Sequence, residues 1–204
     1  MSAKYLGDQI HQDGNNSSTV ETIRNRRGRV KKTIYEIAAV IDDIRLQSLG
    51  GLESGLTIWN MAVIPYLLYN SEVWTDIEKE SLDELEMLQT LFLLALLAVP
   101  LSCPRPALGW DTKSVSMENR IIQRKINFLV HVKNLKEGDL AKQVYDEQVL
   151  NGYPGLVKEV QELCETFRNM LDSKKCQALS LPMSMLTIFM VLPVLPENLA
   201  HRYT

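Results

Sequence analysis

The chain has 204 residues, of which 46% are hydrophobic and 23% charged, and its formal net charge is −3. These values exclude a collagen-like protein, a disordered tail and a dense disulfide scaffold. Three widely spaced cysteines without CxxC spacing, Cys103, Cys164 and Cys176, are typical of reduced thiols in an intracellular protein. The apolar stretches 91–99 and 183–192 are shorter than the roughly 20 residues that span a bilayer. We therefore expect an intracellular chain with no membrane segment.

The net charge hides an uneven distribution along the chain. Residues 1–33 carry seven basic and three acidic side chains, residues 34–86 carry two basic and eleven acidic, and residues 87–136 carry seven basic and two acidic. Because the charges are segregated, the overall value is a poor guide to binding partners.

The N-terminal residues predict a short β-hairpin followed by a long helix. Short segments flank Asp13-Gly14-Asn15, a signal typical of a hairpin turn. Ser18 and Glu21 then have the spacing of a capping box, and apolar residues recur at helical intervals as far as Ile44. A helix over about 18–49 is therefore predicted, ending at Gly50-Gly51.

Helical patterns continue through most of the remaining chain. They predict a helix over 52–69 that Pro65 kinks or splits, and a helix over 75–99 that begins at a second capping box, Thr75 to Glu78. A proline-containing loop follows, and further helices are predicted over about 116–135, 139–150 and 155–171. The fold class expected is mainly α, a helical bundle preceded by a short β-hairpin, with a poorly ordered apolar tail over 176–204.

Basic side chains concentrate in the first predicted helix. Six cations within nine residues suit contact with a phosphate backbone, which requires charge density rather than base-specific geometry. A second polar ridge, formed by Arg120, Arg124, Asn127 and His131, follows helical spacing in the helix over 116–135. A solvated helix face is the alternative interpretation of both clusters. The six cations are Arg24, Arg26, Arg27, Arg29, Lys31 and Lys32.

Catalytic motifs are not found in the sequence. Asp42 and Asp43 are adjacent, as in some divalent metal sites, but they lie within a helical apolar stripe, which favours a solvated acidic face. There is no P-loop, GxSxG or dinucleotide-binding glycine pattern, and the three histidines are dispersed. We expect a non-enzymatic chain with no catalytic residue, no metal site and no cofactor of its own.

The order of these features resembles the region that follows the catalytic palm in reverse transcriptases of LINE-type (non-LTR) retrotransposons. Residues 4–7 and 10–14 are similar to the family's primer-grip hairpin, and the helix beginning near Ile23 is similar to the start of its thumb. Residues 67–74 resemble a Tyr-Gly-x-Glu-x-Trp segment, with Asn70 in place of the usual Gly. Residues 104–112, 116–121 and 153–159 resemble the downstream connector.

The resemblance implies a primer-grip-like hairpin over 1–16, a thumb-like helical domain over 17–100, connector helices over 101–175 and the tail over 176–204. It implies that Lys4, Tyr5 and Gly7 contribute to primer binding, beside the cations of both basic clusters. In the family the catalytic aspartates and their divalent metal lie upstream of the hairpin, so the expectation is a truncated RNA-directed DNA polymerase without fingers and palm. Its expected partner is RNA or an RNA–DNA hybrid. The alternative is a helical interaction protein that self-associates and does not bind nucleic acid.

Overall fold

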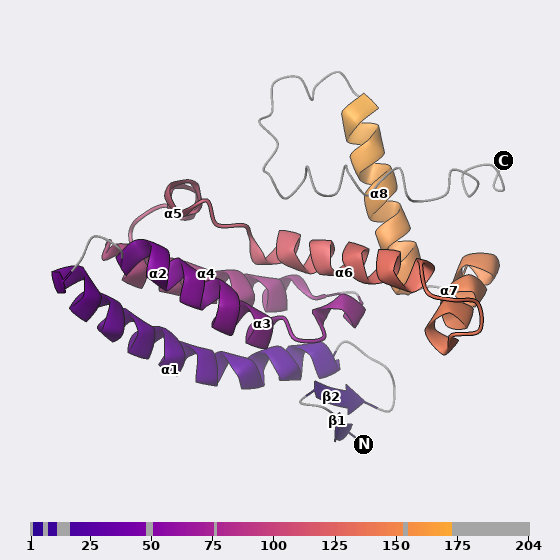
Figure 1. Cartoon of the computed structure of the whole chain (residues 1–204), viewed down its shortest axis with the longest axis horizontal. Helices are drawn as coiled ribbons and strands as arrows, with labels where there is room; N and C mark the ends of the chain where they lie inside the picture. Colours follow the sequence, from indigo (N-terminus) through magenta and orange to yellow (C-terminus); the bar gives the residue numbers. More distant parts are fainter. Residues whose placement is uncertain are drawn as a thin grey trace. The chain divides into compact units, whose positions relative to one another are not determined.

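Helices make up nearly all of the regular structure in the computed structural model, which describes residues 2–5, 8–11, 17–47, 51–75, 77–152 and 155–172 (Figure 1). The prediction of a mainly helical chain is confirmed. The chain divides into two compact units, Met1–Glu118 and Asn119–Thr204. The elements in order are β1 (Ser2–Tyr5), β2 (Asp8–His11), α1 (Ser17–Gln47), α2 (Gly51–Ile58), the π-helix η1 (Trp59–Val63), α3 (Ile64–Leu67), the 3₁₀-helix η2 (Ser71–Val73), α4 (Lys79–Leu97), α5 (Arg105–Thr112), α6 (Met117–Lys133), α7 (Leu140–Asn151) and α8 (Leu156–Asp172).

The N-terminal strands pair antiparallel, with Ser2 opposite His11 and Tyr5 opposite Asp8. The turn that the sequence predicts at 13–15 lies outside the described ranges. Strand β2 packs against α1. The finer assignment of residues 1–16 to a primer-grip-like hairpin stays a prediction.

The first unit is built from α1, the return segment α2–η1–α3, and α4. The return segment runs back alongside α1, and α4 packs extensively against α1 (Figure 1). Arg27 of α1 pairs with Glu84 of α4, and further along both helices Tyr35 and Ala95 line the same hollow. Helices α1 and α4 are therefore parallel.

Aromatic and aliphatic side chains from the three segments form the core of this unit. Trp59 of η1 is fully buried and stacks on Phe92 of α4, with ring centroids 4.2 Å apart and planes at 10°. Helix α1 contributes its predicted apolar stripe, of which Ile23, Val30 and Ile34 are buried. Helix α4 contributes most of its side chains between 92 and 96, which are buried.

Pro65 interrupts the second predicted helix through a π-helical turn. Proline has no N–H to donate and its ring crowds the carbonyl group four residues earlier. The chain accommodates this by widening into η1 just before Pro65, so that the N–H of Ile64 bonds to the carbonyl oxygen of Trp59. The predicted kink is thus a local change of helix type.

Two helix assignments from the sequence are corrected. Helix α4 begins at Lys79 with Glu78 as N-cap, four residues after the predicted capping box at Thr75, and Glu78 makes no side-chain cap hydrogen bond. Helix α5 occupies part of the segment expected to be a loop, because Pro104 is tolerated at the cap and Pro106 within the first turn.

The second unit packs α6, α7 and α8 around one apolar cluster, which includes Ile126, Leu129, Tyr145, Val157 and Val160. The predicted helices of this region are confirmed to within two residues at each end. The predicted segment boundaries at 16, 100 and 175 stay predictions. The division between the two compact units falls within α6, between residues 118 and 119.

Candidate nucleic-acid interface

The outer face of α1 carries three of the six cations that the sequence singled out. Arg24, Arg29 and Lys32 are exposed, and Lys32 makes an exposed ion pair with Glu36 at 3.7 Å. At 100° per residue, these three side chains project over an arc of about 140° on the face opposite the buried apolar stripe. They form the candidate interface, which we call the outer cation face.

Gly28 lies at the centre of the outer cation face, one turn from Arg24 and one turn from Lys32. A Cβ atom at this position would meet no atom within 4 Å, so the helix backbone is open to approach from outside. A phosphate can therefore reach the helix surface here while a cation flanks it on either side. Helix α1 continues through Gly28 without a break.

Arg26 does not belong to this face, because it points into the first unit. Its side chain is 6% exposed, and its guanidinium Nη1 donates hydrogen bonds to the carbonyl oxygens of Leu67 at 3.0 Å and Tyr69 at 2.8 Å. The guanidinium also lies 5.7 Å from the ring centre of Tyr69 and 5.8 Å from that of Trp74. Arg26 thus links α1 to the end of α3 and is unavailable to a phosphate.

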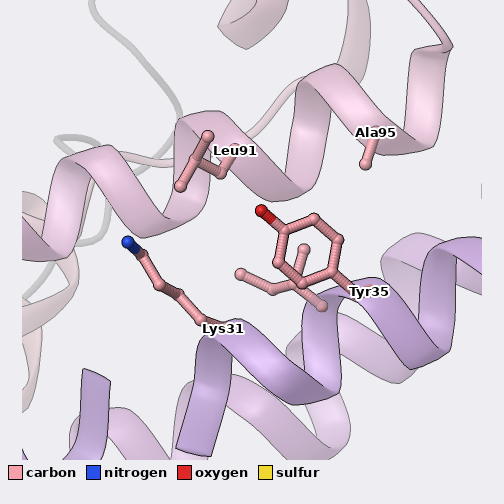
Figure 2. A pocket seen from close by; sticks show the side chains of 5 residues that line it. Lys31, Tyr35, Leu91 and Ala95 are labelled. Carbon is pink, nitrogen blue, oxygen red and sulfur yellow. The ribbon is translucent and has the colours of Figure 1, made fainter. Parts of the chain in front are cut away.

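Arg27 and Lys31 lie along the edge where α1 meets α4. Arg27 forms an ion pair with Glu84 of α4 at 2.7 Å. Lys31 and Tyr35 line a shallow apolar hollow of about 40 Å³ together with Leu91 (Figure 2). Figure 2 shows both side chains reaching from α1 toward α4. The hollow is too small for a nucleotide, so it only borders the outer cation face.

Tyr35 is the residue at this edge that sequence reasoning missed. Its side chain is 69% exposed, one turn beyond Lys31 and close in sequence to Lys32. An exposed aromatic ring beside cations provides a surface on which a nucleic-acid base can stack. The available signal was its position, since Tyr35 follows Arg24, Arg27 and Lys31 at i+11 on the same edge.

The second predicted ridge lies on α6, within the second unit. Asn127 and His131 are exposed, whereas Arg120 and Arg124 are partly buried. Lys125, one residue further along, is 2% exposed and forms an ion pair with Glu159 of α8 at 2.6 Å. The ridge therefore presents less free positive charge than its sequence indicates.

The remaining predicted site residues belong to the N-terminal strands. Lys4 and Tyr5 lie on β1, which pairs with β2 beside α1. Gly7 lies outside the described ranges. The structure thus brings the strands near α1.

Two acidic residues of α4, Glu84 and Glu86, have structural roles. Glu84 pairs with Arg27, and the carboxylate of Glu86 accepts hydrogen bonds from the N–H groups of Met117 at 2.6 Å and Glu118 at 3.3 Å. Burial raises the pKa of Glu86 above its usual value, and this effect exceeds the opposing effect of the two N–H donors. Glu86 therefore caps the start of α6 from α4.

Among the residues that the structure describes, no group of three or more His, Cys, Asp or Glu side chains could hold a metal ion. None of the helices in the described ranges has the length and apolarity needed to cross a membrane. No family model, curated protein or solved structure matches the chain.

Proposed function

We propose that this chain binds nucleic acid through the outer cation face of α1, in the manner of a reverse-transcriptase thumb, without catalysing a reaction. The observation that carries the proposal is the arrangement of Arg24, Arg29 and Lys32 around the open backbone at Gly28. Cations on a rigid helix beside an unobstructed backbone suit a phosphate chain, because they supply charge without demanding a base sequence. Arg26 and Arg27 are left out of the contact set, since both are engaged within the first unit.

The resemblance to LINE-type reverse transcriptases supports the same proposal and adds a substrate class. In that family the thumb and the primer-grip hairpin hold a template–primer duplex, so an RNA–DNA hybrid is the ligand we expect. Strand β2 lies against α1, which is compatible with a joint contact by the hairpin, through Lys4 and Tyr5, and the outer cation face. The finer thumb and primer-grip assignments are part of this proposal.

The test compares the wild-type chain with the triple variant R24E/R29E/K32E in binding a fluorescent RNA–DNA hybrid across a salt series. For the wild type, we expect the logarithm of the affinity to fall linearly with the logarithm of the salt concentration. The variant should lose most of this affinity, and its slope should be shallower by the amount that corresponds to about three phosphate contacts. The matched control, K79E/K113E/K136E, reverses three exposed cations elsewhere and leaves the net charge equal to that of the variant. Equal losses in both triple variants, or wild-type binding that ignores salt, would overturn the proposal.

A further inference from the structure

Tyr35 lies on the same line of α1 as Gly28, where the helix backbone is open to approach. The two residues are seven positions apart, so at 100° per residue their directions around the helix axis differ by only about 20°. At 1.5 Å per residue, Tyr35 is about 10 Å beyond Gly28 along the axis, which corresponds to about three steps of 3.4 Å along a nucleic-acid strand. A strand that crosses the outer cation face along α1 therefore reaches the ring of Tyr35.

The side chain of Tyr35 is available to a ligand. It is 69% exposed, and it borders the shallow hollow that it lines with Leu91 and Ala95 of α4 (Figure 2). A ring with this exposure contributes little to the core, so the fold leaves it free for stacking. Stacking of a base on an aromatic ring tolerates any base, because every base has a π-face.

Lys31 supplies an unpaired positive charge beside this ring. It lies one turn before Tyr35, and its ammonium group forms no ion pair with any carboxylate in the part of the chain that the structure describes. The half of α4 that Lys31 faces is uncharged, since residues 87–104 contain no Asp, Glu, Lys or Arg. A cation without a counter-charge next to an exposed ring suits the phosphate and the base of one nucleotide.

Positive charge on the outer cation face stops just before Tyr35, at Lys32. From residue 33 to residue 44 the charged residues of α1 are all acidic, namely Glu36, Asp42 and Asp43. Because carboxylates repel phosphates, a strand that follows the cations finds nothing to bind beyond Tyr35. Inside a duplex each base is stacked on its neighbours, so a protein ring reaches a base that is unpaired or splayed out. The arrangement therefore favours a strand whose end is unpaired at Tyr35.

We propose that Lys31 and Tyr35 form a site for one unpaired nucleotide at the end of the bound strand, with Lys31 on its phosphate and Tyr35 stacked on its base. The base lies against the exposed ring and not inside the hollow. This site rests on the proposed function and adds a preference to it, namely that a hybrid with a single-stranded overhang binds more tightly than a blunt one. The preference does not depend on the base sequence of the overhang, because stacking carries it.

The test uses the full chain and fluorescent RNA–DNA hybrids that share one duplex. One hybrid is blunt, a second has a short overhang, and a third has an overhang with the same number of phosphates but abasic sugars; each overhang is placed in turn at the 3′ and the 5′ end. Since the two overhangs carry equal charge, the difference between their affinities measures stacking alone. We expect the wild type to bind the overhang that has bases about tenfold more tightly than the abasic one, at one polarity or both.

Variants assign this difference to the two side chains. Y35L should lose the preference and keep the salt dependence, whereas Y35F, which retains the ring, should preserve both. The matched control Y66L removes another exposed tyrosine, on α3, and should also preserve both. K31M should weaken binding of both overhangs and make the salt slope shallower by about one phosphate contact. Circular dichroism checks that each variant is folded.

The outcomes separate this site from the proposed function. A wild type that binds the hybrids but does not distinguish bases from abasic sugars at either end, or a Y35L variant that keeps the preference, would overturn the nucleotide site and leave the proposed function intact. A K31M variant with the wild-type salt slope would exclude Lys31 from the site. A wild type that binds none of the hybrids would overturn the proposed function and the nucleotide site together.

Discussion

Arg26 donates a hydrogen bond to the backbone carbonyl oxygen of Leu67, 41 residues further along the chain, at 3.0 Å. This bond lies at the centre of the first unit, where α1 meets the end of α3. A buried guanidinium that bonds to two carbonyl groups contributes more to stability than an exposed ion pair, because its removal leaves buried acceptors without donors.

The first prediction follows from this contact. Arg26→Ala should lower the free energy of unfolding by about 3 kcal/mol, since each hydrogen bond to a charged group contributes about 1.5–3 kcal/mol and cannot be replaced by water here. Arg24→Ala, the control on the exposed face, should change it by less than about 0.5 kcal/mol. Urea unfolding measures the free energy of unfolding of both variants. Binding of an RNA–DNA hybrid should rank them in the opposite order, with R24A the more impaired. An R26A variant as stable as R24A would contradict the structural role of Arg26.

Sequence reasoning succeeded where the signal was periodic. The long apolar stripe of α1 and the patterns of α6, α7 and α8 predict helices whose bounds agree with the structure, because burial of one face dominates helix position. It failed for the direction of individual polar side chains. In a basic run, Arg26 and Arg24 look alike, and only the tertiary packing decides that Arg26 points toward the carbonyl oxygen of Leu67.

The start of α4 and the contact of Glu86 with α6 are also decided by tertiary packing, which local sequence signals do not show. A capping-box spacing at Thr75 is a local signal, and α4 nonetheless begins at Lys79. Glu86 caps α6 from a different helix, a relationship that no local spacing can reveal.

A second prediction concerns the ion pair in the second unit. Glu159→Gln should destabilise the unit by about 2 kcal/mol, because it leaves the ammonium of Lys125 buried without a counter-charge. Lys125→Met removes that charge while keeping a similar apolar stem, and should change the free energy of unfolding by less than about 1 kcal/mol. Thermal unfolding of the two variants distinguishes them. The interpretation fails if K125M is the more destabilised of the two.

Asn70 provides a third prediction, through its backbone. Its φ angle is 63°, in the left-handed region that favours glycine and that asparagine adopts more readily than most other residues. Asn70→Gly and Asn70→Ala both remove the side chain's interactions, so the difference between them isolates the backbone strain. We expect N70G to exceed N70A in free energy of unfolding by about 1 kcal/mol, measured in urea. Equal stability would show that the left-handed conformation is not maintained in solution.

The fourth prediction is a pH dependence at Glu86. Because burial raises the pKa of this carboxyl group in the folded chain, the folded state holds the proton more tightly than the unfolded state does. This difference acts at pH values between the ordinary pKa of 4.5 and the raised pKa. The contribution of Glu86 to stability is therefore greatest at low pH and declines as pH rises through this window. Glu86→Gln can still accept hydrogen bonds from the N–H groups of Met117 and Glu118 but does not titrate. The free energy of unfolding of the wild type, relative to E86Q, should fall as pH rises above 4.5, and a rise instead would reverse the assigned sign.

Gly28 gives the last prediction, which separates stability from binding. Gly28→Ala should raise the free energy of unfolding by about 0.8–1.0 kcal/mol, because alanine favours the helix interior and its Cβ atom meets nothing within 4 Å. If a phosphate approaches the backbone between Arg24 and Lys32, the same methyl group should weaken binding of an RNA–DNA hybrid. Ala39→Gly is the matched control, since it makes the opposite change at an exposed site further along α1, and it should reduce stability without affecting binding. A G28A variant that is more stable and binds as tightly as the wild type would place the phosphate chain elsewhere on the outer cation face, because only a close approach at Gly28 brings the ligand against that methyl group.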